Sequence, residues 1–240
     1  MKLIDLSHVI EEGMSVFPWL PWPRVGAYFT HGESLPHYEA GTYFEVTHID
    51  MVTSLGTYLD APYHRHPGGA TIDQLAWGQR VLSGVVVDVR GKRPRELIHA
   101  ADLPEAGLCG GAVLFCTGWD RYWKQPAYYQ HPFLSAGAVE ALLEQAPSLV
   151  GIDVLNIDDP QDKAPPAHTQ LLGQDILIVA CPVAARHREN LCGLEQLIHP
   201  AGYRGRSSPF MGAPMKARGA AAFPVRAFVL LAVASGGVEA

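Results

Sequence analysis

Basic residues and long apolar runs are both scarce in this chain. Lysine and arginine number 18 against 24 acidic residues, so the formal net charge is −6, and no basic cluster interrupts this balance. Nucleic-acid-binding proteins show the opposite pattern, and we expect no nucleic-acid partner. No apolar run approaches the ~20 residues of a membrane-spanning helix, and the first residues lack the layout of a signal peptide. The sequence therefore predicts no membrane partner and a cytoplasmic location.

Cysteine is also rare, and its spacing is uninformative. The four cysteines, Cys109, Cys116, Cys181 and Cys192, form no Cys-x-x-Cys pair. Buried, reduced thiols in a reducing compartment are the favoured interpretation. A thiol nucleophile at Cys181, which lies near His187, is the weaker alternative.

Short apolar runs rich in β-branched residues are the main structural signal. They occupy residues 81–89, 112–116, 149–152, 176–179 and 225–233 and are typical of strands buried on both faces. Residues 136–145 have helical periodicity and follow Ser135, a good N-cap. Shorter helical turns are expected at 97–100 and 191–197, and surface loops at 17–23 and 202–214. We predict an α/β fold, one domain over residues 1–240, with a central mixed β-sheet flanked by helices.

Turn-forming and titratable residues are concentrated in residues 54–66, Ser-Leu-Gly-Thr-Tyr-Leu-Asp-Ala-Pro-Tyr-His-Arg-His. Gly56 and Thr57 suit a sharp bend whose backbone N–H groups face a ligand, and Pro62 fixes the separation of Asp60 from His64. Asp60 and His64 could simply cap a turn. Two titratable side chains four residues apart around a proline instead indicate a catalytic loop.

This loop resembles the signature of the cyclase/kynurenine formamidase family of metal-dependent hydrolases, His-x-Gly-Thr-His-x-Asp-x-Pro-x-His. Five positions match it, namely Gly56, Thr57, Asp60, Pro62 and His64. Ser54 and Tyr58 replace its first two histidines, which bind metal in the family. Hydroxyl groups are much poorer ligands for zinc or manganese than imidazole, so this chain is a divergent member.

The resemblance continues along nearly the whole chain in family order. It includes residues 4–8, 117–120, 151–158, 167–168 and 223–227. It implies the swivelling β/β/α-like fold of the family and a homodimer or higher homo-oligomer. It also implies hydrolysis of an aromatic amide and a place in tryptophan catabolism.

The resemblance also assigns roles to residues. Asp60 and His168 match metal-binding positions for a divalent zinc or manganese ion, and His64 matches the acid/base histidine. The family places a glutamate about a dozen residues after the His168 position. Counting without a gap reaches Ala180, whereas Glu189 begins a run similar to the family's glutamate motif. We favour Glu189 as the third metal ligand, after an excursion from the sheet.

Substrate contacts are predicted around the same loop. The hydroxyl of Tyr58 lies where a metal-binding nitrogen normally points, so we give Tyr58 a catalytic role. Ser54, Gly56 and Thr57 are expected to contact the substrate, and Phe17, Trp19 and Trp119 to line an aromatic-binding pocket. Core packing is the simpler alternative for the tryptophans.

Three functions remain open on the sequence. The first is hydrolysis of the C–N bond of an aryl or cyclic amide, such as N-formylkynurenine or isatin, by a water activated by a metal or by the His64–Asp60 pair. The second is a metal-independent cyclase or dehydratase of secondary metabolism. The third is an inactive relative that binds a small aromatic molecule.

Overall fold

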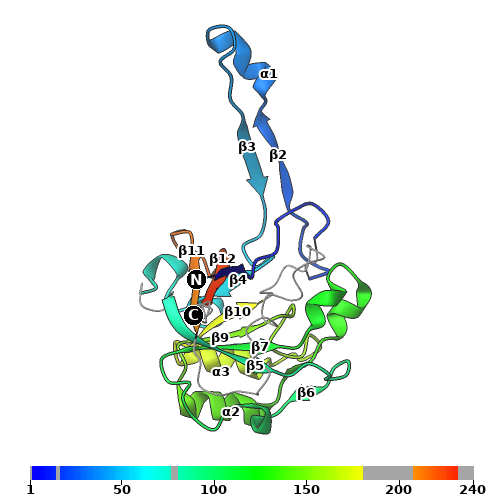
Figure 1. Cartoon of the computed structure of the whole chain (residues 1–240), viewed down its shortest axis with the longest axis vertical. Helices are drawn as coiled ribbons and strands as arrows, with labels where there is room; N and C mark the ends of the chain where they lie inside the picture. Colours follow the sequence, from blue (N-terminus) through cyan, green and yellow to red (C-terminus); the bar gives the residue numbers. More distant parts are fainter. Residues whose placement is uncertain (1, 15–16, 77–80, 181–207, 232–240) are drawn as a thin grey trace, which may run out of the picture.

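The apolar runs of the sequence form the strands of one large sheet (Figure 1). The structure, a computed structural model, describes residues 2–14, 17–76, 81–180 and 208–231. Among these residues the large sheet has eight strands: β1 (Lys2–Asp5), β4 (Tyr58–Asp60), β5 (Val81–Asp88), β7 (Ala112–Cys116), β9 (Leu149–Ile152), β10 (Leu177–Ala180), β11 (Ser208–Pro214) and β12 (Ala222–Leu231).

The sheet is mixed and closes on itself. Its strand order is β1-β12-β11-β5-β7-β9-β10-β4. The strands β5, β7, β9 and β10 run parallel, whereas β4, β11 and β12 pair antiparallel with their neighbours. Because the long β12 pairs with β4 as well as β11, the sheet forms a barrel-like ring. The α/β fold with a central mixed sheet is confirmed.

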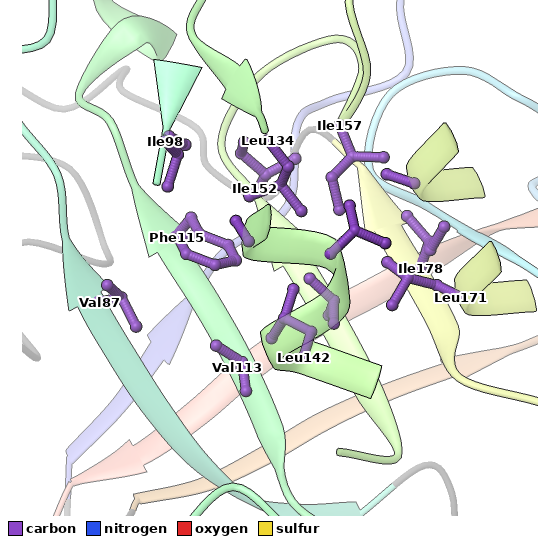
Figure 2. Packing of buried hydrophobic residues seen from close by; sticks show 14 of the residues in the cluster. Val87, Ile98, Val113, Phe115, Leu134, Leu142, Ile152, Ile157, Leu171 and Ile178 are labelled. Carbon is purple, nitrogen blue, oxygen red and sulfur yellow. The ribbon is translucent and has the colours of Figure 1, made fainter. Parts of the chain in front are cut away.

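Alternate side chains of the central strands pack into two separate clusters. Val113 and Phe115 of β7 pack with Leu142 on the helical side of the sheet (Figure 2). Leu114, which lies between them, packs with Phe210 of β11 in the second cluster. Strands buried on both faces explain why these segments read as continuous apolar runs.

Two helices cover the first cluster, α2 (Ala136–Gln145) and α3 (Pro166–Gly173). The α2 helix has the predicted bounds, and the Ser135 hydroxyl accepts a hydrogen bond from the Ala138 N–H at 3.2 Å. The α3 helix begins at a proline, a residue suited to the first turn because its missing N–H would have no partner there. This helix carries His168.

Short 3₁₀ helices connect the strands: η2 (Pro62–His64), η3 (Ile72–Gln74), η5 (Ala100–Asp102), η6 (Trp119–Tyr122) and η7 (Pro126–Gln130). The helical turn predicted at 97–100 is wrong for its first half. Those residues form β6 (Leu97–Ile98), which pairs in parallel with β8 (Phe133–Leu134). Burial of Ile98 in the core favours the extended pairing over a helix.

The loop predicted at 202–214 is also wrong where the structure describes it, because 208–214 form β11 between β5 and β12. Pro209 and Pro214 lie near the ends of this strand, where a missing N–H disturbs the ladder least. Phe210 between them is fully buried. The loop expected at 17–23 contains turns and bends without a helix or strand, and the helix expected at 191–197 lies outside the described residues.

A hairpin that the sequence patterns did not predict projects from the body (Figure 1). It consists of β2 (Arg24–Phe29), α1 (His31–Ser34), η1 (Leu35–His37) and β3 (Val46–Asp50). We call residues 24–50 the arm. Its strands form a separate two-stranded sheet and join no strand of the body within the described ranges.

Cys116 is a buried residue of β7, as expected, but Cys109 is exposed, and Cys181 and Cys192 lie outside the described residues. None of the described helices has both the length and the apolar character of a membrane span.

Candidate metal and catalytic site

Gly56 makes the turn that leads into β4. Its φ is +63°, in the left-handed region where a side chain is disfavoured, and an added Cβ would lie 3.2 Å from Cε of Met14. The hydroxyl of Thr57 accepts a hydrogen bond from the His8 N–H at 3.0 Å. The backbone carbonyl of Thr57 accepts a second one from the Val225 N–H at 2.8 Å. Gly56 and Thr57 therefore fix the position of β4.

Asp60 and His64 meet across the next turn. Asp60 ends β4, between β10 and β12, and is fully buried. Pro62 begins η2, whose tight turn brings His64 back over Asp60. The two side chains approach to 3.4 Å between Nδ1 of His64 and Oδ1 of Asp60, and the His64 side chain stays 28% exposed. His64 is thus open to solvent while it contacts a buried carboxylate.

His168 reaches the same carboxylate from α3. The carboxylate of Asp158 accepts hydrogen bonds from the backbone N–H groups of Ala167 and His168, at 2.7 and 3.0 Å. It also lies 2.6 Å from Nδ1 of His168. This contact orients the imidazole and leaves its Nε2 at 3.7 Å from Oδ2 of Asp60.

These contacts gather Asp60, His64 and His168 into one cluster whose candidate ligand atoms lie within 4.8 Å of one another. Neither carboxylate oxygen of Asp60 accepts a hydrogen bond from a described residue. Its nearest polar groups are the two imidazoles, at 3.4 Å and 3.7 Å, both longer than an ordinary hydrogen bond. A buried polar atom left without a hydrogen bond costs about 1–3 kcal/mol. Carboxylate and imidazole are suitable ligands for zinc or manganese, so the residues present fit a divalent cation.

The charges of the cluster follow from burial and from neighbouring groups. Burial lowers the pKa of His64, and the opposing effect of Asp60 does not outweigh it. Burial acts in the same direction on His168, but the carboxylates of Asp158 and Asp60 raise its pKa overall. Burial disfavours ionisation of Asp158, yet the hydrogen bond with His168 lowers its pKa. His64 is therefore the imidazole whose neutral form is favoured.

A cavity of about 440 Å³ opens beside the cluster. His64 and His168 form part of its wall, and four further predicted site residues line it: Phe17, Trp19, Ser54 and Tyr58. The rings of Phe17 and Trp19 stack with centroids 5.3 Å apart. The structure thus brings the predicted acid/base histidine and a pair of aromatic rings to one cavity.

Three predicted substrate contacts lie elsewhere. Gly56 and Thr57 are not among the lining residues, and neither is Trp119. Trp119 is buried in the main core, and its indole N–H donates to the Ala127 carbonyl at 3.0 Å. The preceding turn is held by Asp153, whose carboxylate accepts hydrogen bonds from the backbone N–H groups of Thr117 and Gly118, both at 2.8 Å. The Thr-Gly-Trp-Asp segment, residues 117–120, therefore contributes to core packing and not to the cavity.

The structure places Ala180 but not Glu189. Ala180 is the last residue of β10, pairs with Tyr58 and is fully buried against Tyr58 and Ala222. The strand therefore extends one residue beyond the predicted end at Val179, and any excursion begins after Ala180. Glu189 lies outside the described residues, and its assignment as a metal ligand stays a prediction.

Sequence patterns missed several residues around the cavity. Arg65, Asn156 and Lys163 line it, and Asp158 orients His168 without being predicted to do so. Arg65 directly follows His64 in the sequence, and this adjacency could have indicated that Arg65 lies at the site. The positions of Asn156 and Lys163 depend on how the segment between β9 and α3 folds over the cavity, and no local pattern encodes that path.

Comparison with known proteins gives consistent matches. A model of the family described as putative cyclase matches residues 4–159. Kynurenine formamidase from Salinibacter ruber (strain DSM 13855 / M31) is 27% identical over 235 residues, which cover 95% of this chain and 96% of that protein. Isatin hydrolase A from Ralstonia solanacearum matches with a TM-score of 0.76 at 20% identity, over 96% of this chain and 92% of its own.

A structure described as a potential metal-dependent hydrolase with cyclase activity gives a TM-score of 0.71 at 23% identity, over 95% of this chain and 96% of the other. The fold is therefore shared over nearly the full length of each protein. The family match spans the loop that carries Asp60 and His64.

Proposed function

Because the chain belongs to the cyclase family, we propose that it is an enzyme that hydrolyses the C–N bond of an aryl amide or a cyclic amide. The observation that carries the proposal is the buried carboxylate of Asp60, which accepts no hydrogen bond from a described residue and lies between two imidazoles that line a cavity. The names of two matched relatives, kynurenine formamidase and isatin hydrolase, denote reactions of this class.

Asp60 and His168 would hold a zinc or manganese ion, and Glu189 is the proposed third ligand. When bound, such an ion lowers the pKa of a coordinated water and polarises the substrate carbonyl. Ser54 and Tyr58 offer only neutral hydroxyls at the cavity wall, so we expect one ion per chain.

His64 is placed to move the proton. Burial lowers the pKa of His64, so near pH 7 its ring is mainly neutral and can accept a proton from the attacking water. The water oxygen bonds to the carbonyl carbon, and the C–N bond breaks. The leaving nitrogen takes the proton from His64, which regenerates the neutral imidazole. The products are a carboxylic acid and an amine.

The lining of the cavity suits an aromatic substrate. Phe17 and Trp19 present stacked rings near His64. Tyr58 is almost fully buried and lines the cavity, so its hydroxyl is our candidate donor to the substrate carbonyl oxygen. Ser54 is a second hydroxyl at the same wall.

The test is turnover of N-formylkynurenine and of isatin by purified protein, before and after treatment with a chelator. We expect hydrolysis of at least one substrate, loss of activity after chelation and recovery on addition of zinc or manganese. Metal content should be measured on the same samples. A protein that binds metal but hydrolyses neither substrate, nor any aryl formamide, would contradict the proposed substrate class.

The hydroxyls of Ser54 and Tyr58 favour one alternative, a metal-independent cyclase or dehydratase in which His64 and Asp60 act directly on the substrate. A metal-independent cyclase or dehydratase would remain active after complete removal of metal. Tight binding of an aromatic amide without turnover, with or without metal, would instead support an inactive relative. Metal analysis with turnover separates the three functions.

Restoring the two missing histidines should add metal affinity. We expect Ser54→His/Tyr58→His to bind more zinc per chain than the parent, because two imidazoles would be added to the cavity wall that His64 and His168 form beside the buried carboxylate of Asp60. Thr53→His, which adds one imidazole to the same wall, is the matched control. Metal per folded chain is measured by elemental analysis after dialysis, and equal content in parent and double variant contradicts the prediction.

A further inference from the structure

Two cationic side chains line the candidate active-site cavity, and the proposed reaction uses neither of them. Arg65 directly follows His64, and Lys163 lies on the segment between β9 and α3. Both residues are exposed, which is usual for charged residues and by itself indicates no function. These two, however, share a concave wall with His64. Their charges therefore act on any molecule that occupies the cavity.

The acidic residues of the same wall do not neutralise this pair. Within the described ranges, neither Arg65 nor Lys163 forms an ion pair with a carboxylate. Asp159 lines the cavity, but its carboxylate accepts a hydrogen bond from Arg95 at 2.7 Å. This pairing leaves two cations at the wall against the single carboxylate of Asp162. The excess charge beside the cavity is positive.

The backbone at Arg65 is fixed by contacts on both sides. Arg65 ends the η2 turn, where its N–H donates to the Pro62 carbonyl at 3.1 Å. The next residue, His66, has its Nε2 at 2.9 Å from the Thr169 carbonyl of α3. Only the side chain of Arg65 has to become ordered when an anion binds, which limits the entropy lost.

The segment that carries Lys163 is held by consecutive turns. The Asp162 N–H donates to the Asp159 carbonyl at 3.0 Å, and the Asp162 carboxylate accepts a hydrogen bond from the Ala164 N–H at 2.8 Å. The ion pair between Asp159 and Arg95 ties the first turn to the body of the domain. Both cations are therefore presented to the cavity from backbone that is already in place.

We propose that Arg65 and Lys163 form a subsite for an anionic group of the substrate, so that the enzyme prefers aryl amides carrying a carboxylate away from the scissile bond. The planar guanidinium of Arg65 can donate two parallel hydrogen bonds to one carboxylate, and the ammonium of Lys163 adds a compact positive charge. The inference rests on the proposed function for the scissile amide and adds the charge of the substrate.

The size and the exposure of the site set the expected effect. The cavity volume of about 440 Å³ suits a single aromatic ring with an amide and one anionic substituent. A neutral aryl amide would leave both cations to water and gain nothing from them. Because exposed ion pairs each contribute little, we expect the two together to give about a tenfold preference for the anion.

The first test measures binding without turnover. Phenylacetate and 2-phenylethanol share an aromatic ring and differ in charge, and neither has an amide bond. By titration calorimetry, the metal-loaded parent should bind phenylacetate about tenfold more tightly than 2-phenylethanol. Arg65→Gln/Lys163→Gln should bring the two affinities within about twofold of each other. A preference of the parent's size in this variant would show that the carboxylate binds elsewhere, on the metal ion included, and would overturn the proposal.

Lys216→Gln/Arg218→Gln is the matched control. It removes one lysine and one arginine that are also exposed but do not line the cavity, so the net charge changes by the same amount. This variant should keep the preference of the parent. Loss of the preference in the control would assign the effect to the overall charge of the protein and not to a subsite.

The second test measures turnover of 4-formamidobenzoate and of its neutral analogue 4-formamidotoluene, followed by release of formate. The ratio of their kcat/KM values should be about 10 in the parent, near 1 in Arg65→Gln/Lys163→Gln and below 1 in Arg65→Glu/Lys163→Glu. Hydrolysis of both amides with the same ratio in all three proteins would overturn the subsite and leave the proposed function standing. Selective binding of phenylacetate without hydrolysis of any amide would support the anion subsite and contradict the proposed reaction.

Discussion

Replacing His64 with alanine is expected to lower kcat/KM for an aryl amide by about 10²–10⁴-fold while the protein stays folded. His64 is the histidine of the cluster with its side chain partly open to the cavity, and burial keeps its neutral form favoured. Its loop position means that alanine leaves no large void in the core. The measurements are steady-state kinetics and a thermal melt on the same preparation.

His66→Ala is the matched control for this experiment. His66 follows two residues later on the same loop and does not line the cavity. Its Nε2 lies 2.9 Å from the Thr169 carbonyl of α3, so the substitution should affect stability more than proton transfer. Equal rates for His64→Ala and the parent would remove His64 from the mechanism. A larger loss in His66→Ala than in His64→Ala would show that α3 placement, and not the imidazole of His64, limits the reaction.

The parts of the fold that the sequence predicted share one physical property. The strands β5, β7, β9 and β10 are covered on both faces, so their apolar runs stand out from their surroundings. The helix α2 is bounded by Ser135, whose cap defines its first turn. In these elements burial and local propensity favour the same conformation, and local patterns suffice.

The arm and β11 were missed for the opposite reason. In β11 the prolines and glycine argue against a strand, and only pairing with β5 and β12 makes it one. In the arm, apolar and polar residues are both exposed, so no burial pattern separates its strands from a loop. Closure of the sheet through β12 and β4 joins segments about 160 residues apart, which no local pattern records.

For the site as well, local sequence patterns predicted the residues that lie on one loop and missed those that the path of the chain brings together. Asp60 and His64 lie on one short loop, so proline and turn chemistry were enough to pair them. His168 was placed only through the family resemblance, and its partner Asp158 was not assigned a role. The hydrogen bonds from Asp158 to the start of α3 depend on the path of the chain after β9. Trp119 resembled a pocket residue in sequence but is buried in the core.

Replacing Asp60 with asparagine is expected to remove both metal binding and turnover. Asp60 contributes the one carboxylate of the described cluster, and the amide of asparagine is a neutral, weaker ligand for zinc or manganese. A ligand at 100 times its Kd stabilises a folded protein by about 2.7 kcal/mol. The parent should therefore melt at higher temperature when metal is added, and Asp60→Asn should not.

The metal-free proteins give an independent readout of the same variant. Because neither oxygen of Asp60 accepts a hydrogen bond from a described residue, the substitution breaks no such bond, and we expect the free energy of unfolding to change little. Asp153→Asn is the matched control, since Asp153 is equally buried but accepts hydrogen bonds from Thr117 and Gly118. It should melt at lower temperature and keep its response to metal. A metal-induced shift of the parent's size in Asp60→Asn would show that the ion binds elsewhere in the chain, and the carboxylate would then lose its assigned role.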